Sequence, residues 1–404
     1  MILTFLFPKI TSPFLKATPS LPQKEPFLAF SSQKKQHSTL SSINSVTPSS
    51  FKKGCKSNAF CKQNSSFKID QKCETCGSKE IIRKGKRKLK YGEVQIYRCK
   101  SCKKFFSSKN LKHKTYPAKV ILNAISTYNL GFTLEKTKKE IAKRFKIKVP
   151  ESTINSWIKE YSSICTFSRI REKALKQSKT EEMIFSKKLQ HKQIYNFQLH
   201  KAKLLLQAKE LPENKFNLMK SYLEKIQTQE FPHHIFTIPD EELEKRASQL
   251  KASLLNIKKL EKQNLANSLA KLGLMLAKTN RERHLCVQNF MLINDSVTIA
   301  TEVPVYLTND DIEYFKNKGF IFDFESYRTP ITGHIDILQI RNGLIHILDY
   351  KPEADKINAV NQLTIYALSL ASRTKLAVKD FKCAWFDDKA YYEFFPLHAV
   401  YRRE

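Results

Sequence analysis

Apolar and polar residues alternate with a period of two along the last third of the chain, which is typical of β-strands. From Val297 onward, two strands are predicted by VTIATEVPVYL and FIFDFESYRTP, and a hairpin about Asn342 and Gly343 is predicted by GHIDILQIRNGLIHILDYKP. A helix then follows in INAVNQLTIYALSLASR, and a last hairpin in FKCAWF and AYYEFF. Strands, a helix and further strands predict an α/β domain over residues 281–404.

Residues 111–165 have the spacing of apolar side chains that is typical of three short helices. Thr133 is expected to cap the second helix, and Pro150 to open the third. The third helix has one apolar face, and its other face carries short polar groups suited to a groove: Ser152, Thr153, Asn155, Ser156 and Lys159. Three helices with this spacing predict a helix-turn-helix unit.

Residues 166–280 are rich in lysine and mostly helical in pattern, so a packed helical spacer or lid is expected there. His233 and His234 are adjacent, but no acid or cysteine stands at a spacing that would complete a metal site.

Residues 1–69 contain a single acid, Glu25, among many serines, prolines and lysines, and predict a disordered basic tail. Its first twenty residues loosely resemble a transit peptide. A tail, a targeting peptide and a misassigned start codon all remain open. The cytoplasm or the nucleoid is the expected location, and organellar import is the alternative. Cys55 and Cys61 fit no metal spacing.

Residues 70–110 contain two Cys-x-x-Cys pairs, Cys73 with Cys76 and Cys99 with Cys102. Two such knuckles can complete a tetrahedral zinc site, and the strand-like segments between them predict a zinc ribbon. So small a unit folds on zinc binding, which supplies about 10 kcal/mol or more to such sites. The arm between the knuckles is basic, and its phosphate-contact candidates are Arg83, Lys84, Lys86, Arg87 and Lys88.

The net charge of the chain indicates a class of binding partner. Lysine and arginine number 71 against 38 acids, for a formal charge of +33, and part of the excess is concentrated in the arm. A field of that sign attracts polyanions, of which nucleic acid is the commonest. The alternative is a lysine-rich surface that is merely solvated. No run of eighteen apolar residues predicts a membrane helix. Nothing in the sequence identifies a protein partner.

Two acids and a lysine interrupt the apolar strands of the predicted hairpin at 333–352. Asp336 is in its first strand, and Asp349 and Lys351 lie two residues apart at the end of the second. A turn at Asn342 and Gly343 places the two acids roughly opposite each other. Two carboxylates at that distance repel, and a magnesium or manganese ion between them would relieve the repulsion. A metal held there can activate water against a phosphodiester, with Lys351 assisting. Strand-end acids with a solvated lysine are the structural alternative.

Two family resemblances extend this interpretation. Residues 70–165, with their C-x2-C pairs followed by TLEKTKKEIAKRFKIKVPESTINSWIKEY, resemble the DNA-binding head of bacterial and archaeal transposases. That resemblance implies DNA docking, with 151–161 as the recognition helix. The three spaced acids of a transposase catalytic core have no counterpart farther along the chain.

Residues 280–396 resemble the PD-(D/E)xK nuclease superfamily, in its RecB-like branch that includes CRISPR-associated exonucleases. Asp336 and the Asp349-Tyr350-Lys351 triplet match its acidic motifs, although GHID replaces the naming proline-aspartate pair. The resemblance implies further roles outside the hairpin. Gln362 and Tyr366 would contact DNA, Glu302 would be an early strand acid that binds metal, and His284 a metal ligand on a helix.

The sequence therefore predicts a multidomain α/β protein: a zinc ribbon, a helix-turn-helix, a helical spacer and a restriction-endonuclease-like domain. Its predicted activity is that of a metal-dependent DNA nuclease with structural zinc and catalytic magnesium or manganese. Two alternatives remain: a non-catalytic DNA-binding regulator derived from a transposon, and an endonuclease partner in transposition.

Overall fold

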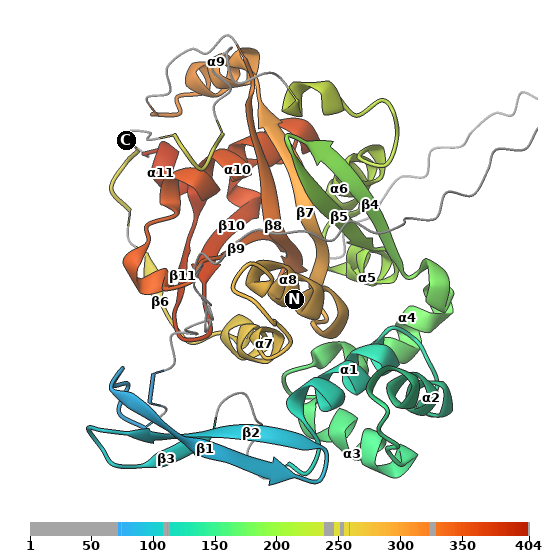
Figure 1. Cartoon of the computed structure of the whole chain (residues 1–404). Helices are drawn as coiled ribbons and strands as arrows, with labels where there is room; N and C mark the ends of the chain where they lie inside the picture. The colour runs from blue at the N-terminus through green and yellow to red at the C-terminus, as the bar shows by residue number, and fades with distance from the viewer. Residues whose placement is uncertain are drawn as a thin grey trace, which may run out of the picture. The chain divides into compact units, whose positions relative to one another are not determined.

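The computed structural model describes residues 72–73, 75–107, 111, 114–237, 246–250, 254–257, 259–322 and 329–402. The predictions made for the tail at 1–69 lie outside these residues. The described part is a mixed α/β protein with eleven α-helices, an eight-stranded mixed sheet and a separate three-stranded sheet (Figure 1). None of its helices has the length and apolar character needed to cross a lipid bilayer.

The three-stranded sheet is built by the cysteine-containing segment. Strands β1 (Ile81–Leu89), β2 (Gly92–Cys99) and β3 (Phe105–Ser107) are antiparallel in the order β1-β2-β3. The first knuckle turns through Gly77 at φ +70°, where the Gly77 amide donates to the Cys73 carbonyl at 2.9 Å. Glycine has no Cβ and adopts this left-handed conformation without strain. The ribbon-like layout expected at 70–110 is therefore present.

Three helices follow, as the spacing predicted: α1 (Ala118–Asn129), α2 (Leu134–Phe145) and α3 (Glu151–Tyr161). Thr133 caps α2 by accepting a hydrogen bond from the Lys136 amide, and Pro150 immediately precedes α3. The helices bury a shared apolar cluster that includes Val120, Ile121, Ile125, Ile141, Ile154 and Trp157.

Residues 166–280 were predicted to be mostly helical, but residues 184–200 form strands instead. Strands β4 (Ile184–His191) and β5 (Gln193–His200) form a hairpin there, and β5 pairs with β7 (Thr298–Leu307). Alternation in this hairpin buries Leu189, Phe197 and Leu199 on one face. Its many lysines and glutamines obscured that period of two. The remaining helices and the short strand of this region are α4 (Arg171–Gln177), α5 (Lys201–Leu206), α6 (Glu213–Lys225), β6 (Leu260–Glu261) and α7 (Leu265–Leu274).

The C-terminal segment supplies most of the eight-stranded sheet, whose order is β4-β5-β7-β8-β9-β10-β11-β6. Its elements are α8 (Arg283–Asn294), α9 (Asn309–Asn317), β8 (Ile331–Arg341), β9 (Leu344–Tyr350), α10 (Val360–Thr374), β10 (Phe381–Phe386), β11 (Tyr391–Phe394) and α11 (Pro396–Val400). Short 3-10 helices connect them and the preceding elements: η1 (Thr166–Arg169), η2 (Thr180–Glu182), η3 (Gln207–Glu210), η4 (His233–Phe236), η6 (Ala354–Lys356) and η7 (Val378–Asp380).

The strand predicted for FIFDFESYRTP is not found where the structure describes it. Residues 320–322 have no regular structure, and 323–328 lie outside the described residues. Helix α9, which the sequence did not predict, lies just before this segment. The five domain boundaries drawn from the sequence remain predictions.

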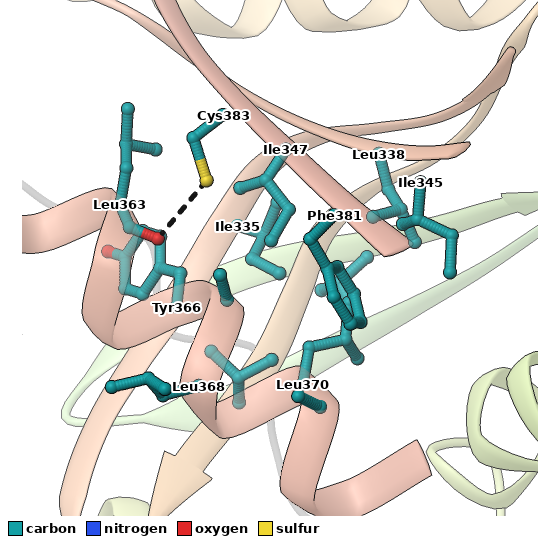
Figure 2. Packing of buried hydrophobic residues seen from close by; sticks show 14 of the residues in the cluster. Ile335, Leu338, Ile345, Ile347, Leu363, Tyr366, Leu368, Leu370, Phe381 and Cys383 are labelled. Carbon is teal, nitrogen blue, oxygen red and sulfur yellow. Dashed lines mark hydrogen bonds between the residues drawn. The ribbon is translucent and has the colours of Figure 1, made fainter. Parts of the chain in front are cut away.

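Helices cover both faces of the central strands. On one face, α10 packs on apolar residues that include Ile335, Ile345 and Ile347, and the Cys383 thiol donates to the Leu363 carbonyl at 3.5 Å (Figure 2). On the other face, α7 and α8 join a cluster with Ile337, Leu348 and Tyr350. Strand β9 is buried on both faces and pairs in parallel with β10, which explains its nearly continuous apolar sequence.

Candidate active site and metal centre

The β8–β9 hairpin has the register that its turn predicted. Asn342 and Gly343 have φ values of +54° and +70°, as a two-residue type I′ turn requires. Ile337 pairs with Leu348, and one step farther from the turn Asp336 and Asp349 come opposite each other. The Tyr350 amide donates to Asp336 Oδ2 at 3.2 Å, which fixes this carboxylate against the neighbouring strand.

A third acid lies opposite Asp336 on its other side. Thr301 of β7 pairs with Ile337, and Val303 pairs with Ile335, so Glu302 between them faces Asp336 across the strands. Glu302 is held at φ +53°, a conformation that costs a non-glycine residue on the order of 1–2 kcal/mol. Three adjacent strands therefore each bring one acid to the same level of the sheet.

Helix α8 supplies two polar contacts to these acids. His284 Nδ1 lies 3.4 Å from Asp336 Oδ2, and the Gln288 side-chain amide donates to Glu302 Oε1 at 2.7 Å. His284, which the resemblance implied as a ligand, is thus beside the acids. Gln288 was missed, although its position one helical turn after His284 places both on one face of α8.

Lys351 and the α10 pair complete the site. Lys351 Nζ lies 2.8 Å from Asp349 Oδ2, and the Gln362 side-chain amide donates to the Tyr366 hydroxyl at 2.9 Å. Tyr366 lies so close to β8 that a Cβ at Gly333 would overlap its ring, so only glycine fits there.

Burial and mutual repulsion perturb the acids. Burial and the nearby Asp336 raise the pKa of Glu302 to about 8. The same two causes raise the pKa of Asp349 well above its usual value, and Lys351 only partly offsets them. For Asp336, burial opposes ionisation, but hydrogen bonding to His284 and the neighbouring charges outweigh it, and its pKa is lowered. Three carboxylates at one level of a sheet therefore resist ionising together, and a cation bound among them would favour their ionised forms.

A cavity of about 230 Å³ opens over this group. Glu302, Asp336, Lys351, Gln362 and Tyr366 line it, together with residues that the sequence did not single out. Those additional residues are His191, Tyr195, Phe236, Arg246, Ser248, Thr332, Gly333 and His334. The first five precede residues 281–404. For His191 and Tyr195, the alternation in 184–200 was the only signal in the sequence.

The donor chemistry of the acid group fits a hard divalent cation, because carboxylate oxygens with one imidazole suit magnesium or manganese. The side chains are not drawn tightly together: among the described residues, the four cysteines are the only group of three or more acids, histidines and cysteines with ligand atoms within 4.8 Å of one another. Binding an ion at the acids would require their side chains to approach one another.

The sulfur atoms of the four cysteines, in contrast, lie close together. Cys73 and Cys102 have their sulfurs 3.5 Å apart, as do Cys76 and Cys99, and all four sulfurs lie within 4.8 Å of one another. A tetrahedron with zinc–sulfur bonds of about 2.3 Å has sulfurs about 3.8 Å apart, so the set fits zinc. Hydrogen bonding from the Cys102 amide lowers the pKa of Cys99 to about 6, which favours the thiolate that binds metal.

The predicted DNA-contact residues of the head are accessible. The five basic residues of the arm are exposed on β1, and Lys86 forms an ion pair with Glu93 at 3.3 Å. On α3, Ser152, Ser156 and Lys159 are exposed, while Thr153 and Asn155 are half-buried.

Comparison with known proteins gave no match: no family model, no curated protein and no solved structure is significantly similar to this chain.

Proposed function

We propose that this protein is a metal-dependent nuclease that hydrolyses phosphodiester bonds of DNA and is held on DNA by its zinc ribbon and helix-turn-helix. The observation that carries the proposal is the alignment of Glu302, Asp336 and Asp349 on three adjacent strands, β7, β8 and β9, beside Lys351. On this proposal the sheet and α10 form a restriction-endonuclease-like domain.

The acids supply a binding site for magnesium or manganese. Such an ion, when bound, lowers the pKa of water and neutralises charge that develops on the phosphodiester. The three carboxylates would hold it, and His284 and Gln288 orient Asp336 and Glu302 through the contacts at 3.4 and 2.7 Å.

Lys351 has its own role in the cavity. Its ammonium projects from the end of β9 into the cavity that the acids line. Burial opposes its charge, but Asp349 outweighs that effect, so its pKa is raised and it stays cationic at neutral pH. A fixed positive charge there can orient the attacking water and stabilise negative charge on the phosphate in the transition state. Gln362 and Tyr366, which line the same cavity, hold the DNA strand.

Residues 70–165 have two features that support DNA as the substrate. The basic arm offers phosphate contacts that position a protein without reading sequence, and α3 presents short polar groups of a kind that enter a groove. The overall charge of +33 favours association with such a polyanion.

The test is an assay of the zinc-loaded, full-length protein on end-labelled single-stranded and double-stranded DNA, with magnesium, manganese or no added metal. Cleavage is expected only with added metal, and Lys351→Ala should reduce its rate at least about 100-fold. The matched control is Lys316→Ala on α9, whose lysine is exposed and outside the cavity. Equal cleavage by wild type and Lys351→Ala would contradict the proposal.

A further inference from the structure

One wall of the active-site cavity is made of stacked rings. Tyr195 lies on His334 with ring centroids 3.6 Å apart and planes 6° apart, and Phe236 lies on His191 at 4.2 Å and 15°. The two stacks meet where His191 Nδ1 approaches His334 Nε2 at 2.8 Å. All four residues line the cavity that contains Asp336 and Lys351.

Ring nitrogens of the histidines in this wall contact one another. His191 lies between two other imidazoles, with its Nε2 2.9 Å from His233 Nδ1. Burial lowers the pKa of His191 to about 4, so the ring is neutral at pH 7 and supplies one donor and one acceptor to its two neighbours. His191 and Phe236 are buried, so the half-buried rings of Tyr195 and His334 are the part of this wall that can face a ligand.

A cation lies at the same cavity. Arg246 is half-buried, lines the cavity and pairs through its backbone with Thr332 of β8. This pairing holds Arg246 beside β8, where Thr332 is only two residues before His334 in the strand. Aromatic rings next to a guanidinium form the usual combination for a base with its phosphate.

We propose that this wall is a subsite for the base of an unpaired nucleotide next to the phosphate at the acids. The inference rests on the proposed nuclease function and adds to it the group that is recognised. A base stacks on the Tyr195 and His334 wall, while Arg246 pairs with a backbone phosphate. A base that lies against this wall inside the cavity cannot at the same time stay stacked and paired in a duplex. The nucleotide must therefore be single-stranded or flipped out of its helix.

Tyr195 and Arg246 give separable variants. Tyr195→Phe keeps the ring, and Tyr195→Ala removes it. Arg246→Ala removes the guanidinium but leaves the backbone pairing with Thr332. Because base–ring stacking is sequence-tolerant and strong, losing the ring should weaken binding about 5- to 150-fold.

The experiment uses the zinc-loaded, full-length protein without added magnesium or manganese, so that nothing is cleaved. The probes are single-stranded thymidine octamers with one 2-aminopurine at the 5′ or the 3′ end. Binding to wild type and to Tyr195→Phe should quench the fluorescence of at least one probe. Tyr195→Ala should abolish the quenching and weaken binding. Arg246→Ala should keep the quenching but reduce the slope of log affinity against log salt by about one.

Each other outcome overturns the subsite. No binding, binding without quenching, or equal quenching by wild type and Tyr195→Ala would do so. If Tyr195→Ala loses its cooperative thermal unfolding, Arg246→Ala decides, and an unchanged salt slope overturns the proposal. Failure of the nuclease proposal looks different: quenching would be intact while added metal gives no cleavage.

Discussion

The zinc ribbon and the eight-stranded sheet depend on their candidate metal sites in opposite ways. Among the described residues of the ribbon, only Cys73 and Cys99 are buried apolar side chains, so the ligands themselves form its centre. The sheet has large apolar clusters on both faces and places its acids at their edge. On the proposed assignments, zinc binding would hold the ribbon together, whereas in the sheet apolar packing brings the acids together and opposes the repulsion between them.

The largest expected effect is on the ribbon. Cys99→Ser should abolish zinc binding and unfold residues 72–107, because zinc supplies about 10 kcal/mol or more to such sites. Mass spectrometry under native conditions should show loss of one zinc, and hydrogen exchange should show loss of protection in β1 and β2 but not in β8 and β9. Cys286→Ser on α8 is the control. Unchanged zinc content in Cys99→Ser would contradict the ribbon assignment.

The second prediction concerns the loss of a charge beside the acids of the sheet, and it is measured as a change in stability. Lys351→Ala leaves Asp336 and Asp349 without their cation, which should destabilise the protein by about 1–3 kcal/mol, less than for a fully buried pair because Lys351 is partly exposed. Added manganese should restore the melting temperature of this variant more than it raises that of wild type. A variant that melts like Lys316→Ala, with no effect of manganese, would be evidence against the repulsion between the acids.

Lys203 of α5 provides a test of how stability depends on pH, and this test does not involve metal. Burial lowers the pKa of this lysine to about 7, below its value of about 10.4 in the unfolded chain. Between those values the unfolded state binds more protons, so stability should rise with pH by up to about 1.4 kcal/mol per unit. Thermal unfolding of Lys203→Met should lack that rise between pH 7 and 10. The same slope in both proteins would show that Lys203 is not responsible.

Gly333→Ala tests the packing between β8 and α10. The added Cβ overlaps the Tyr366 ring, so the ring or the strand must move, at a cost of about 1–3 kcal/mol. Combining it with Tyr366→Ala removes the overlap, and the two effects on the free energy of unfolding should then be strongly non-additive. Additive effects would mean that the two residues are not in contact.

The smallest effect is expected in the basic arm. Arg87→Ala removes one exposed charge from β1, so DNA binding should weaken modestly and its salt slope should fall by about one. The stability of the sheet should not change. An unaltered salt slope would exclude Arg87 from the phosphate contacts.

Local patterns account for what was predictable in this molecule. The cysteine knuckles, the Asn342–Gly343 turn and the three helices after the ribbon are each set by residues close together in sequence, and the structure contains all of them. The opposition of Asp336 and Asp349 follows from that one turn.

Contacts between distant segments could not be predicted in the same way. Tyr195 reaches His334 only because β5 pairs with β7 and β7 pairs with β8, and no short pattern encodes that order. The β4–β5 hairpin was mistaken for helix because Lys187 interrupts its buried face and Ile194 is exposed on the other face, so the alternation of apolar and polar residues is imperfect. Glu302 was implied by resemblance alone, and its place opposite Asp336 depends on the β7–β8 register.

The most direct test of the central claim compares cleavage and binding in Asp336→Asn, with Asp310→Asn on α9 as the control for an exposed acid. Zinc content, the affinity for DNA and the rate of cleavage with manganese should be measured on the same full-length preparations. The account predicts that Asp336→Asn keeps its zinc and binds DNA within about twofold of wild type, but cuts it at least about 100-fold more slowly. Cleavage by Asp336→Asn at the wild-type rate, or no cleavage by wild type with either metal, would contradict it.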